Sequence, residues 1–285
     1  MPQLLTLSLT EGCEETALNE IRLTFRATLS DFTYFTTSFR NMMRSTGCII
    51  TGSTALHFLL RRPSNWKPGH VVIVAPVGQY EAVLNHIMLE RGARLIKSVC
   101  MSEKGANSQL NTGTTRVVHV HTHLAKFIIK ESATASPFHP LPFLWATHLM
   151  NAITADATIC AYPTLTFFNK TLVTNSEYGP LEHEMRKYSR LGFTVFDNAR
   201  ELADVSNSCA EHVVCGKRER IVGDRYTLVV PTGGKNLHDT VLQLAEGRTT
   251  CWKLGGKHCR NRNCFMPGRR EVATTYWQYN SFLNV

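Results

Sequence analysis

The chain has 285 residues, of which 43% are apolar and 19% are charged, and its formal net charge at pH 7 is +9. This apolar content is enough for a substantial core, so the composition excludes a disordered chain and indicates one large or two modest globular domains. The positive charge favours anionic partners such as nucleotides or nucleic acid, although scattered basic residues also occur in proteins that are merely soluble and basic.

The N-terminal residues lack the features of a secretion signal, because they have no basic segment and only a short apolar run. No stretch approaches the length of a membrane span. We therefore expect an intracellular soluble protein, cytoplasmic or nuclear, without a membrane partner. In such a compartment the nine cysteines should be mostly reduced thiols, and their odd number argues against a complete disulfide framework.

Residues 1–46 are predicted to form a helical lead-in. Apolar side chains recur every four residues from Ala17 to Leu29, which is the pattern of an amphipathic helix. Asp31 can cap a second helix, and Gly47 fits the end of that helix. The predicted buried side of the second helix carries Tyr34, Phe35, Phe39, Met42 and Met43.

The next stretch follows the order strand, Gly-Ser turn, helix, loop and strand. The β-branched run at residues 48–50 is typical of a buried strand, and Gly52 and Ser53 interrupt it. Residues 54–60 carry apolar side chains at helical spacing. A second short apolar run covers residues 71–75, directly before a proline.

This order resembles the opening of the nucleotidyltransferase fold, which polymerase β shares with many small transferases. It is similar in detail to nucleotidyltransferase-like proteins of mushroom-forming fungi, whose pattern is Gly-Ser-x-Ala-Leu followed by Trp-x-Pro-x-Asp-Leu-Asp-Ile-x-Val-Pro. The matching residues are Gly52, Ser53, Ala55, Leu56, Trp66, Pro68, Ile73 and Pro76. The resemblance implies an α/β fold, or α+β, with a mixed sheet flanked by helices. It also implies that the Gly-Ser turn faces the nucleotide phosphates.

The metal-binding carboxylates of that family are missing from this chain. His70 and Val72 stand at the two acidic positions. The family's third carboxylate lies on an adjacent strand, for which residues 126–132 are the candidate, and no reasonable register places Glu131 there. Magnesium prefers hard oxygen ligands, so histidine is a poor ligand and valine is none. The resemblance therefore implies the fold without two-metal phosphoryl transfer.

Further elements are predicted beyond this core motif. Residues 79–91 have helical spacing and end at Gly92, and residues 93–99 read as a strand. Residues 144–153 look helical, and the apolar residues 165–168 suggest a strand or a buried edge.

Residues 116–123 read RVVHVHTH, and their period of two is typical of a strand. His119, His121 and His123 would then share one face, and three histidines can ligate zinc or another transition metal. No carboxylate or cysteine lies near them in the sequence. The alternative is a half-exposed strand face on which histidines simply replace other polar residues.

A charged helix is predicted from Glu182 to Tyr188, and the following residues up to Phe193 resemble the fungal pattern Lys-Tyr-x-x-Arg-Gly-Phe. If this helix packs beside the Gly-Ser turn, its cations can meet a phosphate; a solvated charged face is the alternative. The candidate nucleotide-binding residues are therefore Gly52, Ser53, Thr54, His70, Lys187 and Arg190.

The C-terminal region, residues 176–285, is predicted to be helical or irregular and to pack on the core formed by residues 47–175. It contains cysteines and histidines, which together can make a tetrahedral zinc site. Their spacing does not match the C-x2-C knuckle of common zinc fingers. A composite zinc site and a set of reduced thiols both stay open. The candidate ligands are Cys251, Cys259 and Cys264, joined by Cys209 or Cys215.

Other catalytic signatures are absent from the sequence, including a P-loop, a dinucleotide fingerprint and a Gly-x-Ser-x-Gly elbow. Our main hypothesis is a degenerate, catalytically inactive nucleotidyltransferase-fold protein that retains nucleotide or nucleic-acid binding. No cofactor is expected, with zinc as the one candidate. The first alternative is an active enzyme that uses a transition metal at the strand histidines or the C-terminal cysteines. The second is a protein–protein interaction module. The oligomeric state stays open.

Overall fold

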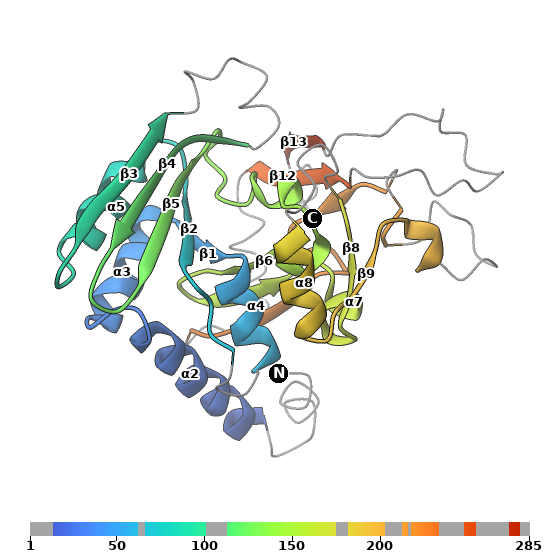
Figure 1. Ribbon diagram of the computed structural model, residues 1–285, viewed down its shortest axis with the longest axis horizontal. Coiled ribbons are helices and arrows are strands. Elements are labelled where there is room, and N and C mark those ends of the chain that lie inside the picture. The colour runs from blue at the N-terminus through green and yellow to red at the C-terminus, as the bar shows by residue number, and fades with distance from the viewer. Residues whose placement is uncertain are drawn as a thin grey trace.

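The structure is a computed structural model that describes residues 14–61, 66–100, 113–174, 182–202, 213–215, 218–233, 248–254 and 274–279. These residues form a mixed α/β fold around an eight-stranded sheet with the strand order β11-β7-β6-β1-β2-β5-β4-β3 (Figure 1). The predicted fold class is therefore confirmed. None of the described helices is both long and apolar enough to cross a membrane.

The α-helices are α2 (Glu14–Ser30), α3 (Thr36–Thr46), α4 (Ser53–Leu60), α5 (Tyr80–Met88), α7 (Pro163–Phe167) and α8 (Glu182–Arg190). Short 3-10 turns are η2 (Leu141–Phe143), η3 (Thr147–Leu149) and η4 (Ala199–Glu201). The main sheet contains β1 (Ile49–Thr51), β2 (Val71–Ala75), β3 (Arg94–Cys100), β4 (Thr114–His121), β5 (Lys126–Ser132), β6 (Asn151–Ile153), β7 (Ala157–Cys160) and β11 (Leu228–Pro231). Two smaller sheets consist of β8 (Lys170–Leu172) with β9 (Thr194–Phe196), and of β10 (Arg220–Ile221), β12 (Arg248–Lys253) and β13 (Thr274–Tyr279).

The two predicted strands on either side of the Gly-Ser turn and its helix, β1 and β2, lie at the centre of the sheet. β1 pairs antiparallel with β2, and β2 pairs in parallel with β5. Gly52 joins β1 to α4 with a φ of +69°, a left-handed conformation that glycine adopts without the steric cost of a side chain. The chain can therefore turn from the strand into the helix within one residue. The prediction that these elements share one mixed sheet is confirmed.

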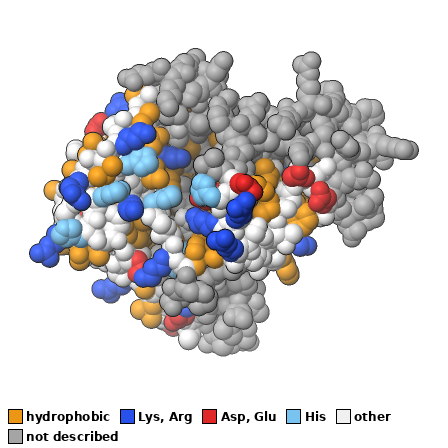
Figure 2. Space-filling model, in the orientation of Figure 1, with side chains coloured by type: hydrophobic (Ala, Val, Ile, Leu, Met, Phe, Trp, Pro, Cys, Tyr) orange, Lys and Arg blue, Asp and Glu red, His pale blue; other side chains and the backbone are white. Residues whose placement is uncertain are grey.

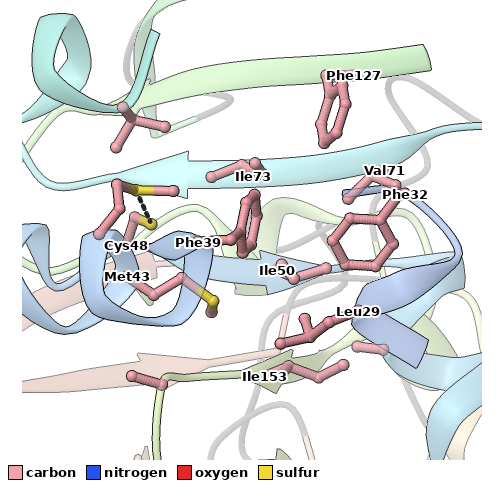
Figure 3. Close-up of a cluster of buried hydrophobic side chains, with 14 of the residues drawn as sticks. Leu29, Phe32, Phe39, Met43, Cys48, Ile50, Val71, Ile73, Phe127 and Ile153 are labelled. Atoms are coloured by element: carbon pink, nitrogen blue, oxygen red, sulfur yellow. Dashed lines mark hydrogen bonds between the residues drawn. The ribbon is translucent and has the colours of Figure 1, made fainter. Parts of the chain in front are cut away.

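One face of the sheet is covered by α2, α3 and α5 (Figure 1). Alternate residues of the strands point into this side, among them Ile50, Ile73 and Phe127, and they meet Phe39 and Met43 from α3 (Figure 3). The helical lead-in therefore supplies one wall of the main hydrophobic core.

The opposite face is divided into two halves. Over β1, β6 and β7, side chains such as Ile49 and Ile159 pack with Tyr162, Trp252 and other residues of the second buried cluster. Over β3, β4 and β5, the residues on this side are half-buried or exposed, including His119 and the lysines of β5. The second half is thus the accessible part of the sheet.

Two secondary-structure predictions are wrong. The predicted helix at residues 144–153 is instead the turn η3 followed by strand β6. Buried polar contacts fix that conformation: the Thr147 hydroxyl accepts from the Leu172 amide at 3.0 Å, and the Asn151 amide group donates to the His148 carbonyl at 2.7 Å. Residues 165–168, predicted as a strand or a buried edge, form no strand: they lie largely within α7, because a proline at the first helical position favours a helix start, although Leu165 and Thr166 are buried.

Two further expectations need correction. The histidine strand β4 ends at His121, because Thr122 forms a turn with Ala125 through both its amide and its hydroxyl, so His123 lies outside the strand.

Asp31 does not cap α3, whose N-cap residue is Phe35. Phe35 is exposed, as is Tyr34, because both precede the helix and point away from the core.

The C-terminal region is more regular than expected, because it adds β11 to the main sheet and forms the β10-β12-β13 sheet. Arg220 on β10 is buried and donates to both carboxylate oxygens of Asp224. Its guanidinium lies 4.7 Å from the ring centre of Tyr162 and 5.5 Å from that of Trp252. This cluster joins the smaller sheet to the main one.

An ion-pair cluster connects α3 to the turn between β6 and β7. Arg44 donates to the two carboxylate oxygens of Asp156 at 2.7 and 3.0 Å, and Arg40 donates to one of them at 3.1 Å. The hydrogen bond from Arg44 holds the pKa of Asp156 below its usual range, although partial burial opposes this shift. The carboxylate is therefore more stable as an anion in the folded protein than in the unfolded chain.

Changing Asp156 to Asn is expected to lower the free energy of unfolding at pH 7 by about 1–3 kcal/mol, the range for losing charged hydrogen bonds. Because the folded-state pKa is depressed, the stabilisation is present above the unfolded pKa of about 3.9 and disappears as pH falls through the folded value. Urea unfolding at a series of pH values should show the difference between wild type and variant shrinking below about pH 4. Glu15→Gln on the exposed face of α2 serves as a control. A difference that stays constant down to acid pH would contradict this assignment.

Candidate functional site

The turn between β1 and α4 presents backbone amides at one end of the main sheet. Within α4 the first amide to bond back is that of Leu56, which donates to the Gly52 carbonyl at 3.0 Å. The amides of Ser53, Thr54 and Ala55 therefore belong to the first helical turn, whose N–H groups lack intrahelical partners. Together with the positive end of the helix, such amides suit an anion.

His70, directly before β2, lies next to this turn. The Thr54 hydroxyl donates to the His70 carbonyl at 3.3 Å and so ties the helix start to the strand start. Desolvation lowers the pKa of His70, and the nearby positive charges of Lys187, Lys130 and His119 lower it further, whereas Glu184 opposes them. His70 is thus a neutral imidazole at pH 7 in a cationic environment.

A cleft of about 360 Å³ opens at the same end of the sheet. Its walls come from the end of α2, from α4, from the loop before β2 and from the turn between β4 and β5. Its polar and charged lining includes Thr54, His57, Lys67, His70 and Lys126, with Asp31 as the acidic member. The cleft adjoins the Gly-Ser turn through Thr54 and His70, so a ligand held at the turn has space beside it.

The accessible side of β2 and β5 contains the positions that the resemblance predicts to correspond to metal-binding carboxylates. In the parallel pairing Val72 lies opposite Ile128, and Val74 lies opposite Lys130. Glu131 faces the other side of the sheet, where its carboxylate accepts from Thr115 and pairs with Arg116 at 3.2 Å. The described residues of β2 and β5 therefore place Val72, Val74 and Ile128 with Lys126 and Lys130, but no acid, on this side.

Lys130 is a half-buried cation that forms no hydrogen bond or ion pair with any described residue. Burial lowers the pKa of its ammonium group. Its charge lowers the pKa of both His70, which directly precedes β2, and His119, which lies opposite Ile128. The ammonium therefore lies near the accessible side of β2, β5 and β4.

Helix α8 packs beside α4 (Figure 1), and Tyr188 shares a buried cluster with Leu56. Lys187 pairs with Glu184 at 3.5 Å and lies close enough to lower the pKa of His70. Arg190, the last residue of α8, is exposed and forms no ion pair with a described residue. The structure thus brings Lys187 to the Gly-Ser end of the sheet but does not bring Arg190 into contact with it.

The metal candidates are only partly described. His119 and His121 project from the same side of β4, whereas His123 lies in the following turn and its ring covers Gly92. Cys251 is buried in β12, and Cys215 is also buried, while Cys209, Cys259 and Cys264 lie outside the described residues. Within the described ranges, no three His, Cys, Asp or Glu side chains are grouped closely enough to hold a metal ion.

Sequence reasoning missed Lys130 and the cleft residue Lys126. The signal was present, because the alternation in KFIIKES places both lysines and Ile128 on one face of a strand. The same period of two identified the histidines of β4. What the sequence did not reveal is the parallel register of β5 with β2, which sets Lys126 beside the Val71–Phe127 pair, at the Gly-Ser end, and Lys130 opposite Val74.

No protein-family model matches the sequence, and no curated protein matches it either.

Proposed function

We propose that this protein is a degenerate nucleotidyltransferase-fold protein that binds a nucleotide through its phosphates without a divalent metal and does not transfer it. The observation that carries the proposal is Lys130, a half-buried cation opposite Val74 that forms no ion pair with a described residue and whose charge acts on His70. A buried charge without a partner costs free energy, and a bound anion would supply the partner that this lysine lacks in the free protein. The resemblance of residues 47–76 to nucleotidyltransferases supplies the expectation of a nucleotide.

The phosphates would contact the amides of Ser53 and Thr54 from one side and the ammonium of Lys130 from the other. Carboxylates on the accessible side of β2 and β5 would repel phosphate unless metals intervened, and the described residues of these two strands supply none on that side. His70 contributes by taking up a proton, since a bound anion raises the pKa that desolvation and the neighbouring cations lower. The cleft lined by His57 and Lys67 offers space for the nucleoside.

Lys130→Met is expected to weaken nucleotide binding about tenfold or more, because a charged hydrogen bond contributes about 1.5–3 kcal/mol. The same change should leave the free protein as stable as wild type or more stable, since it removes an unpaired, partly buried charge. Titration of ATP and GTP in the presence of EDTA, together with thermal unfolding, measures both effects. Lys170→Met, at an exposed position on β8, is the matched control.

Gly52→Val tests the turn independently, because a β-branched residue strains the left-handed conformation by about 1–3 kcal/mol and disturbs the amides that follow. Its folding is checked first by circular dichroism. Two results would overturn the proposal: wild type that shows no saturable binding at millimolar nucleotide, or magnesium-dependent incorporation of labelled nucleotide that is lost in Ser53→Ala.

A further inference from the structure

The outer strands of the main sheet carry cations well beyond the turn between β1 and α4. Strand pairing places Lys126 opposite His121 and His121 opposite Arg94, and it places His119 opposite Lys97. Paired residues of neighbouring strands project to the same side, so these side chains form two rows across β5, β4 and β3. We define the basic face as Arg94, Lys97, His119, His121, Lys126 and Lys130.

The charge of the basic face is not compensated locally. None of its six side chains forms an ion pair with a described residue. The described strands β2 to β5 contain a single acid, Glu131, which points to the opposite side and is paired there. Figure 2 shows histidine, lysine and arginine side chains gathered over these strands. A polyanion would therefore meet attraction along the whole face.

The dimensions of the basic face suit an extended chain of phosphates rather than one nucleotide. Neighbouring strands lie about 4.8 Å apart and residues along a strand about 3.3 Å, so the basic face extends about 10 Å from β5 to β3 and about 13 Å along β5 from Lys126 to Lys130. The half-buried imidazoles of His119 and His121 lie between the more exposed Lys126, Arg94 and Lys97. Histidine rings stack on unpaired bases, whereas the bases of a duplex are already stacked inside the helix. Alternating cations and rings thus favour a single strand.

We propose that the basic face binds single-stranded nucleic acid, with the phosphates held by the lysines and arginine and the bases against the two imidazoles. This proposal deepens the proposed function by naming a longer ligand. It rests on the proposed function only at the end of the basic face that lies nearest His70. The remaining contacts come from β3, β4 and β5 and do not involve the Gly-Ser turn.

Fluorescence anisotropy of labelled oligouridylate and oligothymidylate of about ten nucleotides measures the binding. If about three cations each neutralise one phosphate, log K should fall with log salt at a slope of about −2. The double variant Lys97→Ala, Lys126→Ala should bind about tenfold or more weakly at about 100 mM salt, and the slope should become less steep by about 1.4. The control Lys170→Ala, Arg225→Ala removes the same charge from other exposed positions and should bind like wild type.

The same proteins titrated with ATP separate the two proposals. The single variant Lys97→Ala, whose side chain does not line the cleft, should lose oligonucleotide affinity but keep its ATP affinity, and Gly52→Val should keep most of its oligonucleotide affinity. The two oligonucleotides distinguish RNA from DNA, since a preference for oligouridylate requires contacts to the 2′-hydroxyl. Three results would overturn the inference: equal weakening by the control variant, tighter binding of a duplex of the same length, or binding only to phosphatidylserine vesicles.

Discussion

Phe39→Ala is expected to lower the free energy of unfolding by about 3–5 kcal/mol, the range for removing a buried aromatic side chain. Phe39 is fully buried between α3, α5 and the sheet. Its ring packs edge-on against Phe32 with the ring centres 5.5 Å apart, and it also contacts His86 of α5. Truncation leaves a cavity among rigid neighbours that cannot collapse to fill it.

Phe35→Ala provides the matched comparison, because Phe35 lies one turn away and its side chain is 60% exposed. That change should alter stability by no more than about 0.5 kcal/mol. Urea unfolding of both variants, followed by circular dichroism, gives the two values. Similar values for the two phenylalanines would show that α3 is not packed on the sheet as described.

Arg220→Met is expected to cost about 3–5 kcal/mol of stability, because breaking a buried ion pair leaves the partner charge uncompensated. Arg220 is 1% exposed, donates to the Ala161 carbonyl at 2.8 Å, and is paired with Asp224. Methionine retains much of the apolar stem but none of the hydrogen bonds, so the loss reflects the guanidinium itself.

Arg225→Met removes the same charge at an exposed position five residues away and should change stability by about 0.5 kcal/mol or less. Guanidinium chloride unfolding is suitable for both proteins. If Arg220→Met unfolds within about 1 kcal/mol of wild type, the buried cluster around Tyr162 and Trp252 does not hold the two sheets together as inferred.

The central motif was predictable because each of its parts carries a local signal. The β-branched run, the Gly-Ser interruption and the helical spacing after it all fall within 30 residues, and the structure has each element within one residue of its predicted bounds. Helices α5 and α8, whose apolar or charged patterns are regular, begin within one residue of their predicted starts, but α5 ends three residues earlier and α8 two residues later than predicted. Local pattern and tertiary environment agree in these segments.

Residues 144–153 show why other parts were not predictable. Their apolar spacing is helical, but His148 is buried, and its Nδ1 lies 2.7 Å from the Thr171 hydroxyl more than twenty residues away. Long-range hydrogen bonds of this kind override a local preference. Lys130 is a similar case, because the residues that surround its side chain are fixed by the parallel pairing of β2 with β5, two strands separated by 50 residues of chain.

Strand β3 is the last strand in the described order of the main sheet, and its pairing with β4 shifts register between Leu95 and Lys97. Terminal strands expose unpaired backbone groups that can recruit another copy of the chain and start aggregation, and a bulge or a charge discourages this. Leu95 and Ile96 are each 52% exposed here, between the positive charges of Arg94 and Lys97. Arg94 and Lys97 are therefore also expected to keep neighbouring molecules apart, and a chain that lost both charges should become prone to self-association.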